Sequence, residues 1–219
     1  MLVQIYEVQT PEEAVALARL GVDHIGVLVG EGSFAREVSA ARARAIFGAL
    51  PVETRRVALS LVTDPAQLAR VIEEARPDIL HIGAAIELVS PAQVRSLKAA
   101  YPCTAFMRSI PVVDRESVGW ANAYRDIADF LLLDSHDPGD RQIGGLGRTH
   151  DWNISRRIVE EVGVPAILAG GLGPDNVAAA IAAVHPAGVD SKTRTDRPHR
   201  LGKDLDKIRR FVAAAKLTR

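Results

Sequence analysis

Cysteine is almost absent from this sequence: Cys103 is the single one among 219 residues. One cysteine excludes a disulfide framework and a cysteine-rich metal site, because both need several thiols. No apolar run approaches the length of about 18 residues that crosses a bilayer, which argues against a membrane span. The first residues show neither a basic stretch nor a small-residue cleavage site, so we expect a cytoplasmic protein.

Net charge is also absent, with 27 Lys and Arg against 27 Asp and Glu. A zero balance argues against a nucleic-acid partner, since nonspecific binding of nucleic acid needs a basic excess. The charges are distributed unevenly, however. Residues 191–219 hold ten basic and three acidic side chains, a surplus of seven. The neutral total therefore conceals a cationic region near the end of the chain.

Short apolar runs alternate with helix-length amphipathic segments along the whole sequence. Runs with strand character begin near Leu2, His24, Arg56, Asp78, Cys103, Asp129, Pro165 and Ala187. Each is a short apolar stretch of the kind found in parallel strands covered on both faces. Eight alternations without a linker predict a single (β/α)8 TIM barrel over residues 1–219, with an open doubly wound sheet as the alternative. The first strand-to-helix turn has no glycine-rich dinucleotide fingerprint, which argues against the open sheet.

Helix starts are marked by capping residues followed by proline. Thr10-Pro11, Asp64-Pro65 and Ser90-Pro91 each combine a side-chain cap with a proline at the first helical position. Gly21 is expected to end the first helix. A basic amphipathic pattern over residues 203–216 predicts a last helix.

The functional end of such a barrel is formed by the carboxyl ends of its strands. The seventh strand ends in Gly170-Gly171, whose open backbone N–H groups precede a helix. The eighth is followed by two hydroxyls and two cations, Ser191, Lys192, Thr193 and Arg194. Loops after strands seven and eight usually bind phosphate in these barrels, so we predict a phosphate site here. The alternative for the glycine pair alone is a tight turn, with both cations in solvent.

Asp134 ends the apolar run over residues 130–133. Partial desolvation there would raise the pKa of its carboxyl group and suit a general acid. The alternatives are a carboxylate that caps the next loop or one paired with an arginine.

Several motifs occur in a fixed order in the second half of the chain: LLLDS, GGLGRTHDW, PAILAGGLGPDNVAAAI and GVD, followed by LGKD. In order and spacing they closely resemble phosphoribosylanthranilate isomerase, the tryptophan-pathway enzyme that performs an Amadori rearrangement. The resemblance is strongest over the last 90 residues or so and covers nearly the whole chain. It implies a barrel of the ribulose-phosphate-binding type, a phosphorylated small-molecule substrate, and a monomer or homodimer.

The resemblance also implies residue roles. Asp134 falls on the general acid that opens the ribose, and Arg36 on the arginine that meets the anthranilate carboxylate. Gly170 and Gly171 fall on phosphate-binding backbone. The glycines of residues 144–147, with Gly145 at the substrate, would form a mobile loop. Arg108, at the end of the expected fifth strand, is a further candidate for substrate binding.

The chain departs from the family at three places. Tyr6 stands where the family has its cysteine, the general base at the sugar C2, and a free tyrosine with a pKa of about 10 is a poor base. His81 replaces a glutamine of the fourth strand; it is a candidate replacement base, or a hydrogen-bonded core histidine. Cys103 begins the fifth strand, at the wrong end of the barrel. After strand eight, the family's small residues are exchanged for Lys192 and Arg194.

The leading interpretation is an isomerase in which Asp134 is the acid and His81 or Tyr6 its partner, with no cofactor and no metal. One alternative is a lyase or epimerase of the ribulose-phosphate-binding barrels. Such an enzyme could hold a metal on the loop with Asp134, His136, Asp137, Asp140 and His150. The other alternative is a non-catalytic phosphometabolite-binding protein.

Overall fold

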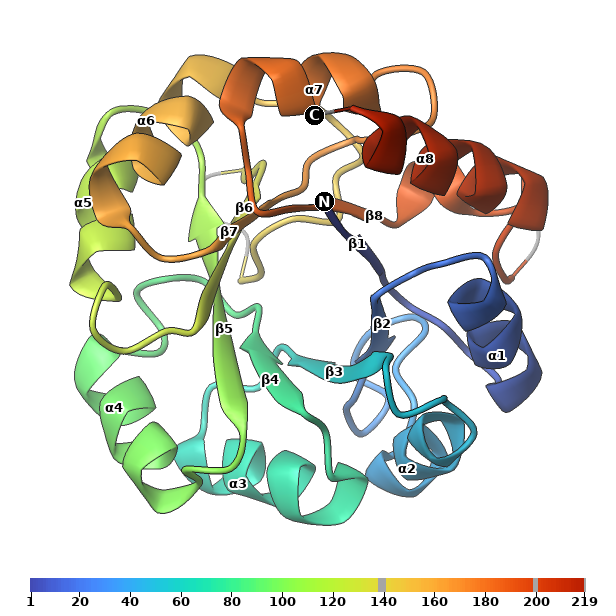
Figure 1. Cartoon of the computed structure of the whole chain (residues 1–219). Helices are drawn as coiled ribbons and strands as arrows, with labels where there is room; N and C mark the ends of the chain where they lie inside the picture. Colours follow the sequence, from blue (N-terminus) through green and yellow to red (C-terminus); the bar gives the residue numbers. More distant parts are fainter. Residues whose placement is uncertain (138–140, 199–200, 219) are drawn as a thin grey trace.

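The computed structural model describes residues 1–137, 141–198 and 201–218, and its parallel strands form a closed barrel (Figure 1). The strands β1 to β8 are Leu2–Ile5, His24–Leu28, Arg55–Ser60, Ile79–Ile82, Ala105–Pro111, Phe130–Asp134, Ala166–Leu168 and Gly188–Ser191. Each strand pairs with the next along the sequence, and β1 closes the ring by pairing with β8. This closure confirms the predicted barrel and excludes the open sheet.

An outer ring of helices surrounds the barrel in the described residues (Figure 1). The helices α1 to α8 are Pro11–Arg19, Ala40–Gly48, Pro65–Ala75, Pro91–Ala100, Glu116–Ala123, Trp152–Val162, Val177–Val184 and Leu205–Leu217, and a 3-10 helix spans Thr193–Thr195. The expected caps Thr10, Asp64 and Ser90 each accept a backbone N–H of the first helical turn. Within the described ranges, no helix is long and apolar enough to cross a membrane.

Two apolar layers hold the barrel together, because strand side chains alternate between its interior and its helix-facing side. The larger layer lies between strands and helices. The smaller one fills the interior with Tyr6, Val57, Ile79, Met107, Leu132, Ile167 and Ala169. The interior is thus packed rather than open, and the polar residues gather where the strands end.

The fifth strand starts later and runs further than expected. β5 begins at Ala105 instead of Cys103 and continues to Pro111. Met107 packs in the barrel interior and Ser109 bonds an interior histidine, so Arg108 between them faces the helices. Cys103 is exposed just before the strand, at the amino end of the barrel, where it was expected.

Candidate active site

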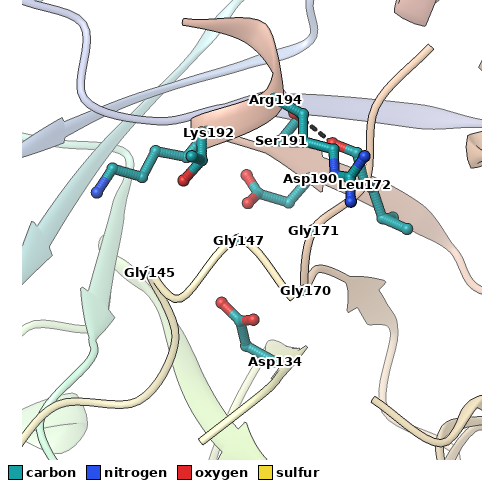
Figure 2. A pocket seen from close by; sticks show the side chains of 11 residues that line it. Asp134, Gly145, Gly147, Gly170, Gly171, Leu172, Asp190, Ser191, Lys192 and Arg194 are labelled. Atoms are coloured by element: carbon teal, nitrogen blue, oxygen red, sulfur yellow. Dashed lines mark hydrogen bonds between the residues drawn. The ribbon is translucent and has the colours of Figure 1, made fainter. Parts of the chain in front are cut away.

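The loops after β6, β7 and β8 enclose a small cup, which we call the phosphate cup after the ligand that the sequence predicts for it (Figure 2). Its lining consists of Asp134, Gly145, Gly147, Gly170, Gly171, Leu172, Asp190, Ser191, Lys192, Thr193 and Arg194. All six residues predicted to bind phosphate therefore lie together. The Ser191 hydroxyl donates to the Leu172 carbonyl at 2.7 Å, which ties the end of β8 to the loop after β7.

The glycine pair in this cup is required by two independent features. Gly170 and Gly171 have φ angles of +82° and +61°, which side chains rarely adopt. A Cβ on Gly171 would also lie 2.7 Å from the carbonyl oxygen of Gly147, and one on Gly170 would lie 2.7 Å from Nδ1 of His150. The chain therefore requires residues without side chains at these two positions. A site that binds an anion through backbone N–H groups has the same requirement.

The two cations after β8 differ in their surroundings. The Lys192 ammonium forms an ion pair with Glu7 at 2.8 Å and points away from the glycine pair (Figure 2). The Arg194 side chain is exposed and packs over Gly173, where a Cβ would meet it at 3.0 Å. Arg194 thus borders the cup directly, whereas Lys192 stands between the cup and its neighbouring cavity.

Asp134 ends β6 with its carboxyl group at the cup. One carboxylate oxygen accepts the Ser135 backbone N–H at 2.7 Å. Burial raises the pKa of this carboxyl group to about 6, while the hydrogen bonds from Ser135 and the charge of Lys192 oppose the rise. A carboxyl group with that pKa holds or releases a proton near neutral pH, as a general acid must.

A larger cavity of about 300 Å³ adjoins the cup. It shares four residues with the cup: Asp134, Gly145, Asp190 and Lys192. The rest of its lining is Tyr6, Glu7, Leu28, Phe34, Ala35, Leu59, Leu61, His81, Leu132, Gln142, Ile143 and Gly144. The two hollows together offer an anion site, a polar middle and an apolar end.

Tyr6 and His81 form one hydrogen-bonded unit at the floor of this cavity. The Tyr6 hydroxyl lies 2.5 Å from Nδ1 of His81, and Nε2 lies 2.7 Å from the Ser109 hydroxyl. Burial raises the pKa of Tyr6 well above 10, and burial together with Arg108 lowers that of His81 to about 3. Both side chains are therefore neutral at physiological pH. The Tyr6 ring also occupies the space over Gly26, where a Cβ would lie 2.1 Å from it.

Arg36 belongs to a partly buried ion network beside the cavity. One of its terminal nitrogens, NH1, bridges Asp196 at 2.7 Å and Glu7 at 3.2 Å. Glu7 also holds Lys192, and Asp196 also holds the buried Lys203. Arg36 and Glu7 both have positive φ angles, +71° and +60°, conformations that this network stabilises.

Arg108 lies elsewhere. Its guanidinium is buried and donates to the carbonyls of Ile82, Ala84 and Ala85, and it stacks over the ring of Tyr124. The described cavities do not include it in their linings. The structure therefore does not bring Arg108 to the other predicted site residues; it holds the segment after β4 in place.

Asp190 is a cavity residue for which no role is predicted from the sequence. It lies within β8, lines both hollows, and accepts a hydrogen bond from Gln4 at 3.3 Å. Glu7, just after β1, is a second cavity residue that the sequence analysis did not single out. The position of Asp190 could have indicated its place in the cavity. It precedes the predicted site residue Lys192 by two positions, and side chains two residues apart along an extended chain share a face.

The loop considered for a metal forms other contacts. His136 bonds a backbone carbonyl, Asp137 pairs with Arg148, and His150 bonds a serine of α6. Asp140 lies outside the described residues. Among the residues described, no three His, Cys, Asp or Glu side chains gather as they would around a metal ion.

A closed barrel with an anion-binding cup after β7 and β8 and a buried acid at the end of β6 is typical of barrel enzymes that act on phosphorylated small molecules. The profile of one family, N-(5'-phosphoribosyl)anthranilate (PRA) isomerase, matches residues 4–214. The chain belongs to this family.

Relatives cover almost the whole chain. The N-(5'-phosphoribosyl)anthranilate isomerases of Methanocella arvoryzae and Haloferax volcanii are each 34% identical over 99% of this chain and over 99% and 94% of their own. The crystal structure of the Thermotoga maritima enzyme matches 99% of this chain and 98% of its own, with a TM-score of 0.80 and 26% identity. These matches confirm the predicted class: an Amadori-type aldose–ketose isomerase of tryptophan biosynthesis. They do not favour a lyase, an epimerase or a non-catalytic binder.

Proposed function

We propose that this protein isomerises N-(5'-phosphoribosyl)anthranilate, the substrate in the names of its relatives, with Asp134 as general acid. The observation that carries the proposal is the position of Asp134. Its buried carboxyl group, with a pKa raised to about 6, lies where the phosphate cup meets the larger cavity. A sugar phosphate bound in the cup would present its furanose ring to this group.

The phosphate group of the bound substrate would help to keep Asp134 protonated. A dianion in the cup disfavours the nearby carboxylate and raises the pKa of Asp134 further, so that the bound complex holds the proton. Asp134 then donates this proton to the ring oxygen. The bond from C1 to the ring oxygen breaks, and the nitrogen lone pair forms a Schiff base. Loss of the C2 proton gives the enaminol, which becomes the aminoketone.

The remaining part of the substrate fits the apolar end of the larger cavity. Leu28, Phe34, Leu61 and Ile143 line it, as an aromatic ring requires. Arg36 is the proposed partner of the carboxylate. Only its NH1 nitrogen bonds the described carboxylates, so the anchored guanidinium keeps further donors for a substrate.

Tyr6 and His81 are proposed to act as a unit rather than as separate bases. Both imidazole nitrogens have partners, so His81 reaches a substrate only through the Tyr6 hydroxyl. Tyr6 is part of the lining of the larger cavity. The unit would orient the sugar with a neutral hydrogen bond.

The test is turnover of phosphoribosylanthranilate by the purified protein, together with rescue of a tryptophan auxotroph. We expect activity in both assays, and its loss in Asp134→Asn. Asp137→Asn is the matched control, because that exposed carboxylate follows on the same loop. Absence of both activities from the unchanged protein would refute the proposed function. Sedimentation with and without substrate would distinguish the monomer from the homodimer.

A further inference from the structure

A buried carboxyl group faces Asp134 across the site and has no part in the mechanism above. Asp190 is 6% exposed and lines both the phosphate cup and the larger cavity. In Figure 2 the carboxyl groups of Asp134 and Asp190 turn toward the same space. Its bond from Gln4 reaches one oxygen only, and Gln4 is in turn held by His24 at 3.1 Å. The hydrogen bond from Gln4 thus orients the Asp190 carboxyl group, and its other oxygen is left to face the cavity.

The reaction requires a group that removes the C2 proton, and the floor of the cavity does not supply a good one. The Tyr6 hydroxyl is neutral, because burial and the charge of Asp190 raise its pKa. His81 is a weak base with a pKa of about 3, and its nitrogens already bond Tyr6 and Ser109. Glu7 holds Arg36 and Lys192 with its two oxygens. Asp190 has no such ion pair in the described parts of the chain.

Resting on the proposed function, we propose that Asp190 is the catalytic base of this protein, and that Asp134 and Asp190 work as a pair that shares one proton. Two carboxyl groups in one desolvated site do not both ionise readily, so one proton is retained. A carboxylate whose proton affinity is raised by its surroundings is also the stronger base.

The charges around Asp190 are consistent with this pairing. Burial raises the pKa of Asp190 well above its ordinary value, the charges of Asp134 and Glu7 add to the rise, and Gln4 and Lys203 oppose it. In the reactive state the proton is on Asp134 and Asp190 is ionised. Once Asp134 has donated this proton, the positive nitrogen of the Schiff base, which is bonded to C1 next to C2, favours the ionised form of Asp190.

The proton transfers balance over one turnover. Asp134 donates to the ring oxygen as the bond from C1 breaks. Asp190 takes the proton from C2, and the electrons of that C–H bond form the enaminol double bond. Asp190 then returns its proton to C1, and Asp134 takes the hydroxyl proton from the oxygen on C2. Both groups finish in the state in which they began, and the product is the aminoketone.

The experiment compares Asp190→Asn with Tyr6→Phe, using phosphoribosylanthranilate carrying hydrogen or deuterium at C2. Asp190→Asn should lower kcat by about 100-fold or more, the usual contribution of a general base, with little change in KM. Its isotope effect should exceed that of the unchanged protein, because C2–H cleavage becomes rate-limiting. The rise of kcat with pH that reports the base should disappear. Tyr6→Phe should lower kcat less than about tenfold and leave the isotope effect unchanged.

Each outcome is decisive. A large loss in Tyr6→Phe with an enlarged isotope effect, and a small loss in Asp190→Asn, would overturn the assignment of Asp190 while leaving the proposed function standing. A loss in Asp190→Asn without a change in the isotope effect would make it a structural residue and overturn the assignment as well. No turnover by the unchanged protein would overturn the proposed function and the assignment together.

Discussion

Asp134 illustrates, at the scale of one residue, how a functional group opposes stability. Its carboxyl group has a pKa of about 6 in the folded protein, against 3.8 for an unperturbed aspartate. The folded state therefore binds the proton more tightly than the unfolded state. As pH rises from about 4 to about 6, this difference lowers the free energy of unfolding, and the loss persists at higher pH.

We therefore predict that Asp134→Asn stabilises the protein at pH 8 while abolishing turnover. The shift from 3.8 to about 6 corresponds to about 3 kcal/mol, and the amide can still accept the Ser135 N–H. At pH 4 the two proteins should be nearly equal in stability. Urea unfolding at both pH values measures the difference, with the exposed Asp137→Asn as control. Equal stabilities at pH 8 would contradict the prediction.

Whether the sequence could predict a site residue depends on whether a local pattern marks it or tertiary packing brings it to the site. Asp134 and the glycine pair were found because strand ends and adjacent glycines are local signals. Arg108 was misplaced because its side depends on where β5 begins and ends, and alternation puts it toward the helices. The Tyr6–His81 bond joins residues 75 positions apart, and barrel closure creates it. Local sequence patterns therefore predict where a site residue lies in the fold, whereas tertiary packing determines which residues it contacts.

At the scale of elements, the phosphate cup is made by loops that approach each other through glycine. The loop after β7 touches the backbone of the loop after β6 at Gly171 and Gly147. The sequence predicted the loops after β7 and β8, since both carry anion-binding residues. It did not predict this contact, because the number of residues in a loop does not fix its path.

Gly171→Ala should remove phosphate binding. The added Cβ would lie 2.7 Å from a carbonyl oxygen at a φ of +61°, so the loop must move. Inorganic phosphate should raise the Tm of the unchanged protein by mass action, and this rise should be largely lost in the variant.

The matched control is Gly163→Ala, at the end of α6. Its φ is also positive, +75°, but nothing lies within 4 Å of the added Cβ. It should lose about 1 kcal/mol of stability from backbone strain and keep the full phosphate shift. Loss of the phosphate shift in both variants would show that strain alone, rather than the contact with Gly147, explains the effect.

At the scale of the whole molecule, Lys203 connects the end of the chain to its beginning. Its backbone N–H donates to Glu13 of α1 at 2.5 Å, and its ammonium reaches Asp196 at 2.6 Å and the Lys192 carbonyl at 3.3 Å. The side chain is 1% exposed. These bonds join α1, the loop after β8 and the start of α8, next to the strand pair that closes the barrel.

Lys203→Met should destabilise the whole barrel by about 3 kcal/mol, because it removes the buried ammonium and leaves the partly buried Asp196 without one of its two cations. The control Lys216→Met removes an exposed ion pair with Asp23 and should change stability by no more than about 0.5 kcal/mol. Thermal and urea unfolding of both variants measure the difference. Similar stabilities would show that the ion pair between the Lys203 ammonium and Asp196 does not stabilise the barrel.

The ring of Tyr6 over Gly26 makes these two positions interdependent. With any larger residue at position 26 the ring has no room, since an added Cβ would overlap it. Tyr6→Cys alone would empty the space of the ring and leave Nδ1 of His81 without its hydrogen-bond partner. A substitution at either position therefore disturbs the packing at the other, so β1 and β2 constrain each other's sequence at this level of the barrel.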